Sequence, residues 1–204
     1  MGLPFRHSGP ATGARVLIFE EQPLAGVFTI EPEPAHDARG LFARTYSREE
    51  FAQNGLDFEI AQASVSFNAS RGTLRGMHLQ MPPHEEAKLV RCLAGSVHDV
   101  VVDLRAGSVT QLRWLAVALS AERRNAIYIP PGLAHGFLTL EDASELEYLI
   151  SSPYEPGAAA GVRWDDPAVA IEWPFAPTVI SERDAAFPDL DQARVADHGP
   201  AGLA

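Results

Sequence analysis

A series of short apolar runs, separated by residues that form turns, constrains the fold of this chain most. The turns include Pro82-Pro83, Ala94-Gly95, Ala106-Gly107 and Pro130-Pro131-Gly132, which preset or permit the dihedrals of tight reversals. Short apolar runs spaced in this way are typical of antiparallel strands. They cover residues 16–19, 26–30, 40–46, 58–67, 74–80, 88–93, 96–104, 112–119, 126–129, 136–140 and 145–150. Because two sheets closed over one core protect many strand edges, we predict an all-β jelly-roll barrel.

Helices are expected only at the flanks of this barrel. One helix should begin after Ser47, whose hydroxyl caps the first turn while Glu50 reaches back to the cap, and end near Asn54-Gly55. Residues 1–14 and 189–204 are poor in large apolar side chains and are predicted to be flexible tails. Residues 15–188 should then form a single domain, a cupin-like jelly-roll barrel with short flanking helices.

The charge and cysteine content exclude several classes of protein. The net charge is −11 and the isoelectric point is near 5.0, which argues against a nucleic-acid or anionic-membrane partner, since both need a basic surface. No apolar run approaches the ~20 residues that a membrane span requires. Cys92 is the only cysteine among 204 residues, so no internal disulfide forms, and its place in an apolar run indicates a buried thiol. We therefore predict a cytoplasmic protein.

Cationic side chains interrupt two adjacent apolar runs. Arg75, His78 and Lys88 stand among Leu, Met and Val on either side of the Pro82-Pro83 turn. Burying an unpaired charge is costly, so these groups need an anionic partner, which a substrate can supply. Arg75 and His78 are three residues apart and would face opposite sides of a regular strand, so we expect a bulge at Gly76 to align them.

The histidines differ in their surroundings. Residues 130–135, Pro-Pro-Gly-Leu-Ala-His, fit half of the metal-binding cupin pattern, but His78-Leu79-Gln80 supplies one imidazole where two ligands are needed. Glutamine is a poor ligand for transition metals, so we predict no metal and assign His78 and His135 to the site. His98 is predicted to be a hydrogen-bonded structural residue. The remaining histidines are expected on the surface: His7, His36, His84 and His198.

Five segments together resemble one family. They are residues 71–80 (Arg-Gly-Thr-Leu-Arg-Gly-Met-His-Leu-Gln), 88–91 (Lys-Leu-Val-Arg), 97–105, 128–137 (Tyr-Ile-Pro-Pro-Gly-Leu-Ala-His-Gly-Phe) and 161–173. In this order, across residues 25–187, they resemble the dTDP-4-dehydrorhamnose 3,5-epimerase family. The resemblance implies a cofactor-free, cupin-type homodimer whose partner is a nucleotide-diphosphate 4-keto-6-deoxyhexose. The implied reaction inverts C3, C5 or both, the carbons next to the ketone.

The resemblance also implies catalytic roles. His78 would be the base, and Asp184 would hold its imidazole in one tautomer. Lys88 would stabilise the enolate oxygen, and Tyr148 would return a proton on the opposite ring face. Lining or substrate-binding residues would be Arg75, His135, Arg39, Phe42, Gln62 and Arg183.

The base-recognition positions depart from the family pattern. Arg44 stands where thymidine-using members carry a glutamate, Ala63-Ser64 replace Asp-Asn, and Ala159 replaces another glutamate. We keep Arg44 as a substrate contact and predict a nucleotide other than thymidine, or a relaxed base preference. Two alternatives stay open: a ketoisomerase acting on a related nucleotide sugar, and a non-catalytic cupin that binds sugar nucleotides.

Overall fold

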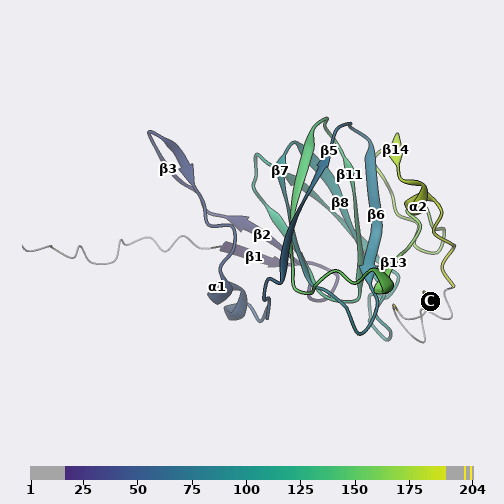
Figure 1. Cartoon of the computed structure of the whole chain (residues 1–204). Coiled ribbons are helices and arrows are strands. Elements are labelled where there is room, and N and C mark those ends of the chain that lie inside the picture. Colours follow the sequence, from purple (N-terminus) through teal and green to yellow (C-terminus); the bar gives the residue numbers. More distant parts are fainter. Residues whose placement is uncertain (1–16, 192–199, 201–202, 204) are drawn as a thin grey trace, which may run out of the picture.

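Two mainly antiparallel sheets face each other in a sandwich that forms the body of the molecule (Figure 1). The computed structural model describes residues 17–191, 200 and 203. The first sheet has the strand order β1 (Leu17–Glu21), β2 (Phe28–Pro32), β10 (Ala126–Ile129), β7 (Lys88–Ala94), β12 (Ser144–Ile150) and β5 (Gln62–Asn68). The second has the order β13 (Ala159–Gly161), β6 (Thr73–Gln80), β11 (Leu133–Thr139), β8 (Ser96–Asp103) and β9 (Trp114–Ser120). The all-β, cupin-like prediction is confirmed, and each predicted apolar run overlaps a strand.

Three short strands were not predicted. One is β3 (Ala35–Asp37), which pairs with β4 (Gly40–Phe42), a strand inside the predicted run 40–46, to form a separate hairpin that projects away from the sandwich (Figure 1). β13 was not predicted either, and neither was β14 (Val179–Ile180), which pairs parallel with β6. Strands of two or three residues carry too few side chains to show an alternating pattern.

The core between the sheets is apolar and closely packed. Val90 of β7, Val101 of β8, Ile127 of β10, Phe137 of β11 and Leu146 of β12 belong to one cluster and are almost fully buried. Burying such side chains stabilises the fold by roughly 1.5–3 kcal/mol each. Because these strands come from both sheets, the cluster fixes one sheet against the other and so holds the walls of any cavity between them.

Helix α1 (Arg48–Gln53) begins and ends where the sequence predicts. Ser47 accepts a hydrogen bond from the Glu50 amide at 3.4 Å. The expectation that Glu50 reaches back to Ser47 is wrong, because its carboxylate instead accepts from the Leu17 amide at 2.7 Å and from Arg44 at 2.6 Å. An unpaired strand amide and a guanidinium are stronger competitors for a carboxylate than the amide of the cap residue.

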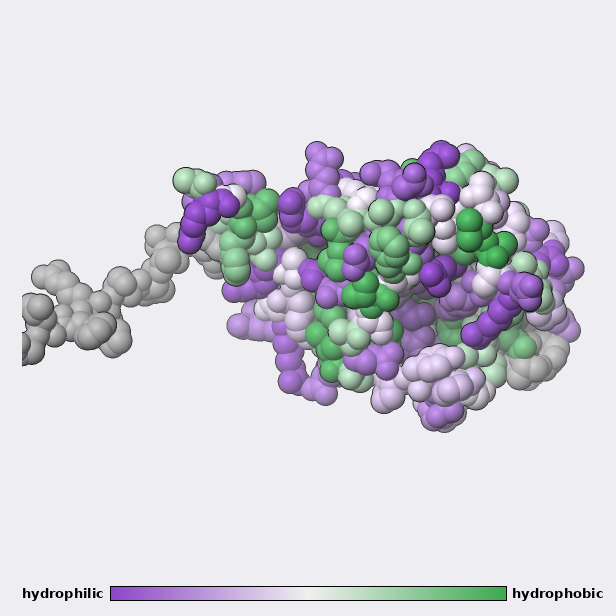
Figure 2. Space-filling model, turned by 45° about the horizontal axis from the view of Figure 1, so that its top comes forward, coloured by the Kyte–Doolittle hydropathy of each residue, from purple (hydrophilic) through white to green (hydrophobic). Residues whose placement is uncertain are grey.

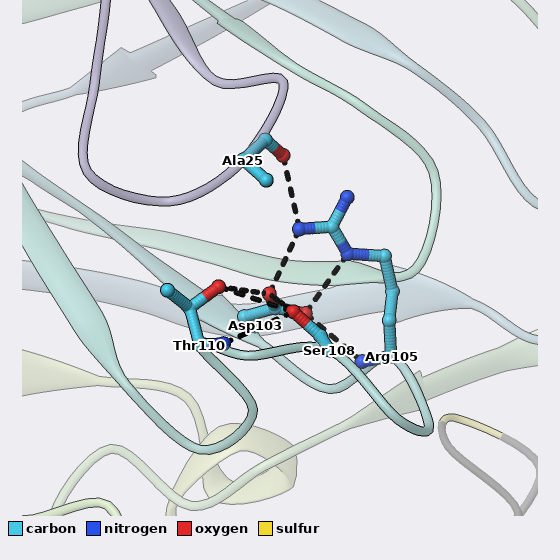
Figure 3. Close-up of polar contacts among 5 residues, drawn as sticks. All are labelled: Ala25, Asp103, Arg105, Ser108 and Thr110. Atoms are coloured by element: carbon cyan, nitrogen blue, oxygen red, sulfur yellow. Dashed lines mark hydrogen bonds and ion pairs between the residues drawn. The ribbon is translucent and has the colours of Figure 1, made fainter.

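A polar network joins the two sheets at one end of the sandwich (Figure 3). The buried Asp103 carboxylate accepts from Arg105 Nε at 2.9 Å, from Ser108 Oγ at 2.6 Å and from Thr110 Oγ1 at 2.7 Å. Arg105 also donates to the carbonyl of Ala25, in the turn between β1 and β2. The network therefore links the end of β8 to a turn of the opposite sheet.

The C-terminal part of the chain returns to β6. It contains a 3-10 helix η1 (Pro156–Ala158), then β13, β14 and the second helix α2 (Glu182–Ala185), which the sequence did not predict. Of the predicted tails, 1–14 and most of 189–204 lie outside the described residues. Asp189 pairs with Arg163 at 2.6 Å, and the Leu190 amide donates to Asp166 at 2.7 Å. The described residues include no helix long and apolar enough to cross a membrane.

Candidate active site

A pocket between the two sheets collects most of the predicted site residues. Its lining includes Gln62, Arg75, His78, Lys88, His135, Tyr148 and Arg183. β6 and β11 of the second sheet supply one wall, while β5, β7 and β12 of the first sheet supply the other. Residues far apart in the sequence thus meet in one cavity because the two sheets close over it.

A bulge in β6 places Arg75 and His78 on the same side. His78 pairs with His135 of β11, and Arg75 pairs with Phe137, so β6 carries one extra residue over this interval. Gly76 has a φ of 135° in the bulge, and a Cβ there would lie only 2.5 Å from the backbone of β11. The predicted bulge at Gly76 is confirmed, and only glycine fits there without displacing the neighbouring strand.

His78 and Asp184 form a hydrogen-bonded pair at the pocket. His78 Nε2 lies 2.8 Å from Asp184 Oδ1, and the Gly76 amide donates to the other carboxylate oxygen at 3.1 Å. Burial would raise the pKa of Asp184, but the hydrogen bonds from His78 and Gly76 outweigh it and lower that pKa. The ionised carboxylate favours the tautomer with the proton on Nε2, which leaves the Nδ1 lone pair available as a base.

Lys88 occupies the first position of β7, and its ammonium group is anchored from two sides. Its Nζ lies 3.1 Å from Glu86 Oε1 and donates to the carbonyl of His78 at 3.2 Å. An ammonium has three N–H donors, so one remains for the pocket. The arrangement fixes a positive charge next to the backbone of His78 and leaves one N–H donor free to bind a ligand.

A second histidine–carboxylate pair lies deeper in the pocket. His135 Nε2 lies 2.8 Å from Asp99 Oδ2, and both side chains are almost fully buried. The His135 ring lies edge-on to Tyr148, with 5.9 Å between ring centroids. The sequence reasoning missed Asp99, although a signal was present, because it is an acidic residue at an inward position of the apolar run 97–102.

Of the remaining pocket residues, Arg75 and Gln62 have polar partners and Arg183 lies near an aromatic ring. Arg75 Nε donates to Asn68 Oδ1 at 2.8 Å, and this contact directs the guanidinium from β6 toward β5. Gln62 Oε1 accepts from the Tyr154 amide at 3.1 Å. Arg183 lies near the ring of Phe187, at 5.9 Å from the ring centroid. Arg75 and Arg183 together give the pocket mouth the positive charge that an anionic ligand needs.

Three of the predicted substrate-binding residues do not line the pocket of their own chain. Arg39 pairs with Asp37 in the projecting hairpin, and Phe42 of β4 is 67% exposed. Arg44 pairs with Glu50 of α1 at 2.6 Å. The hairpin projects away from the sandwich (Figure 1), and the pocket lining of this chain includes none of the three residues, so their role as substrate contacts stays a prediction.

The structure also resolves the predictions for residues outside the pocket. The prediction that His98 is a hydrogen-bonded structural residue does not hold for its Nε2, which is buried without a partner among the described residues, and the ring packs on Trp173. Cys92 is buried, as predicted. His36 and His84 are exposed, as predicted, whereas His7 and His198 lie outside the described residues. Within residues 17–191 no group of three or more His, Cys, Asp or Glu side chains is arranged to hold a metal ion.

Comparison with known proteins identifies the family of this chain. The family described as dTDP-4-dehydrorhamnose 3,5-epimerase matches residues 21–192. The chain belongs to the dTDP-4-dehydrorhamnose 3,5-epimerase family. Its resemblance to that family is therefore confirmed, and the protein is an isomerase of the epimerase type.

Relatives cover most of the chain. A dTDP-4-dehydrorhamnose 3,5-epimerase of Mycolicibacterium smegmatis is 44% identical over 86% of this chain and 87% of its own length. The structure of NovW, a 4-keto-6-deoxy sugar epimerase from Streptomyces spheroides, has a TM-score of 0.84 at 38% identity and covers 96% of each chain. A family enzyme from Bacillus anthracis, solved with TDP and PPi bound, has a TM-score of 0.83 at 32% identity, covering 86% of this chain and 100% of its own.

Proposed function

We propose that this epimerase inverts C3, C5 or both in a nucleotide-diphosphate 4-keto-6-deoxyhexose. One observation carries the proposal: His78 and Tyr148 come from facing sheets and line the same pocket. Inversion requires a base on one face of the sugar ring and an acid on the other. A sugar lying between the two sheets would present its opposite faces to these two side chains.

The residues have matching roles in the proposed reaction. His78 takes a proton from a carbon next to the ketone, and the electron pair of the broken C–H bond moves to the C4 oxygen. The remaining Lys88 donor stabilises this enolate, a contact of a kind worth roughly 3–4 kcal/mol in a preorganised site. The Tyr148 hydroxyl then returns a proton to the opposite face. The phenolate takes up a proton from solvent and the His78 imidazolium releases one to solvent, which restores both groups. Asp184 orients His78 and does not react.

The nucleotide portion is assigned to the mouth of the pocket. Arg75 and Arg183 suit a diphosphate, because a guanidinium can bond two oxygens at once. The relatives are named for dTDP-linked sugars, and one is solved with TDP, so we propose a dTDP-sugar as the first substrate to test. Arg44, Ser64 and Ala159 still predict relaxed base selectivity, and thermal shifts with dTDP, CDP, UDP and GDP would measure it. Clear selectivity for dTDP over the other three nucleotides would contradict the prediction of relaxed base selectivity.

We also propose a homodimer. Strand β5 has one neighbour, β12, and so presents an open edge. Val65 and Phe67 on it are 58% and 59% exposed, and Figure 2 shows apolar patches on the face beside the projecting hairpin. A partner's hairpin laid against this sheet would cover apolar surface and bring its Arg39 and Phe42 to the pocket. Light scattering would test the assembly.

A cytoplasmic location stays a prediction from the sequence.

Incubation in D₂O tests the proposed function directly. The protein is mixed with dTDP-4-keto-6-deoxyglucose, and deuterium at C3 and C5 is read by NMR. Incorporation with inversion supports an epimerase and identifies the centre. A product with its carbonyl moved to C3 would indicate a ketoisomerase, whereas binding without exchange would indicate a non-catalytic cupin. Either result would contradict the proposal.

A further inference from the structure

Glu86 is a buried carboxylate of the pocket that the proposed reaction leaves without a role. It lies two residues before Lys88, so both side chains point to the same face of the extended chain and line the pocket. Only 6% of the Glu86 side chain is exposed. Its Oε1 binds the Lys88 ammonium at 3.1 Å, whereas its buried Oε2 has no hydrogen-bond partner among the described residues.

The unmatched oxygen indicates a ligand donor. A buried carboxylate oxygen without a partner is destabilising, and the great majority of such atoms are hydrogen-bonded in folded proteins. The Lys88 ammonium is already bound to Oε1 and to the His78 carbonyl. A ligand that enters the pocket with a hydroxyl group can donate to Oε2 without adding charge.

The chemistry of the proposed substrate selects one hydroxyl. This step rests on the proposed function, in which Lys88 binds the C4 oxygen of the sugar. Glu86 binds the same ammonium, so its Oε2 lies on the ketone side of the hexose. Of the two carbons next to C4, only C3 carries a hydroxyl, because C5 carries the ring oxygen and the methyl group.

We propose that Glu86 Oε2 accepts a hydrogen bond from the C3 hydroxyl of the sugar nucleotide. Glu86 is then a substrate-binding residue that also positions the Lys88 ammonium through its other oxygen. The site would select hexoses that keep the C3 hydroxyl, since a 3-deoxy sugar would leave a buried carboxylate oxygen unpaired.

The test compares Glu86→Gln with wild type by calorimetry. Glutamine keeps an acceptor for Lys88 but presents an amide N–H₂ group, a donor, where Oε2 was. The ligands are dTDP, dTDP-6-deoxyglucose, which lacks the ketone and cannot react, and its 3-deoxy analogue. Glu85→Gln is the matched control, because it makes the same chemical change one residue earlier, outside the pocket lining. Melting temperatures verify that both variants are folded.

We expect Glu86→Gln to bind dTDP-6-deoxyglucose about five- to tenfold more weakly, with dTDP affinity unchanged within about twofold. Wild type should bind the 3-deoxy analogue more weakly than dTDP-6-deoxyglucose by a similar factor. Glu86→Gln should bind the 3-deoxy analogue as tightly as wild type does. Glu85→Gln should match wild type throughout. Unchanged sugar-nucleotide affinity in Glu86→Gln, or equal losses on both sugars, would overturn the inference.

Binding and turnover separate this inference from the proposed function. The calorimetric cycle uses unreactive ligands and needs no catalysis, so it gives a result even if the enzyme does not exchange protons. Deuterium exchange in wild type with unaltered binding by Glu86→Gln would refute the role of Glu86 alone. Absence of exchange in wild type would refute the proposed reaction alone.

Discussion

The imidazole of His78 and the carboxylate of Asp184 meet at 2.8 Å although 106 residues separate them in the chain. Strand β6 carries the histidine and helix α2 carries the aspartate. Ser181 caps α2 by accepting from the Asp184 amide at 3.0 Å. The cap and the Gly76 amide hold the carboxylate in place, so the pair is organised before any ligand binds.

Removing the imidazole should abolish most turnover. We expect His78→Ala to lower kcat by roughly 10²-fold or more, because a positioned general base contributes about that much. Nucleotide affinity should stay near that of wild type, measured by calorimetry with dTDP. His84→Ala, which removes an exposed imidazole outside the pocket, is the control. Wild-type kcat in His78→Ala would disprove the assignment of the base.

Neutralising Asp184 should act through His78. Asp184→Asn keeps a polar group of similar size but no longer stabilises a protonated imidazole, so we expect kcat to fall by roughly tenfold or more with little change in KM. The double variant with His78→Ala should be no slower than His78→Ala alone. Additive losses in this kinetic cycle would show that the two residues act separately.

The Tyr148 hydroxyl should be needed for inversion but not for proton removal. We expect Tyr148→Phe to continue exchanging the proton next to the ketone for deuterium while forming at least about tenfold less inverted product. Burial raises the pKa of Tyr148 above its ordinary range, so the phenol stays protonated at neutral and mildly alkaline pH. The wild-type rate should therefore show no loss from tyrosine ionisation up to about pH 9. Equal loss of exchange and inversion in Tyr148→Phe would contradict this division of roles.

Arg75 should contribute mainly to nucleotide affinity. Arg75→Ala removes a guanidinium that Asn68 directs into the pocket, and we expect dTDP to bind roughly tenfold or more weakly, since a charge-assisted contact is lost. The affinity for thymidine, which lacks phosphate, should be the same in Arg75→Ala and in wild type. Calorimetry with both ligands measures the difference, and Arg113→Ala at an exposed loop position serves as control. An equal loss for both ligands would place Arg75 away from the diphosphate.

Asp103 should stabilise the fold in a pH-dependent way. Burial would raise its pKa, but hydrogen bonds from Arg105, Ser108 and Thr110 lower it from 3.8 to about 2. A pKa lowered by folding gives stability that is present above about pH 4 and lost as the pH falls toward 2, by about 2 kcal/mol. Asp103→Asn should therefore lower the free energy of unfolding by about 2 kcal/mol at pH 7.

Denaturant unfolding at pH 7, 4 and 2.5 would test the role of Asp103. The difference between wild type and Asp103→Asn should narrow at pH 2.5, because the carboxyl of the unfolded chain is protonated there and that of the folded chain begins to be protonated. Asp57→Asn, at an exposed position, should show no such difference. A constant gap between Asp103→Asn and wild type across this range would show that charge is not the cause.

Local patterns in the chain were sufficient to predict the longer strands, helix α1 and the bulge at Gly76. Alternation of apolar side chains and turn residues acts over a few neighbouring positions, so it can be read without knowing the fold. The resemblance also assigned His78, Lys88, Tyr148 and Asp184 to one site. The sequence reasoning missed Asp99 and Glu86. The inward position of Asp99 in an apolar run was a signal of burial, but the local sequence does not reveal which partner a carboxylate will meet.

The sequence by itself determined the all-β class, the family and the residue types of the site. Only the tertiary structure decided which side chains share the pocket: it brings Asp184 to His78 and leaves Arg39, Phe42 and Arg44 outside. It also decided that the Glu50 carboxylate binds the Leu17 amide and Arg44 and not the cap residue Ser47. Contacts between distant segments depend on how two sheets and a projecting hairpin pack, and that packing is a sum of many burial and hydrogen-bond energies that no short segment contains.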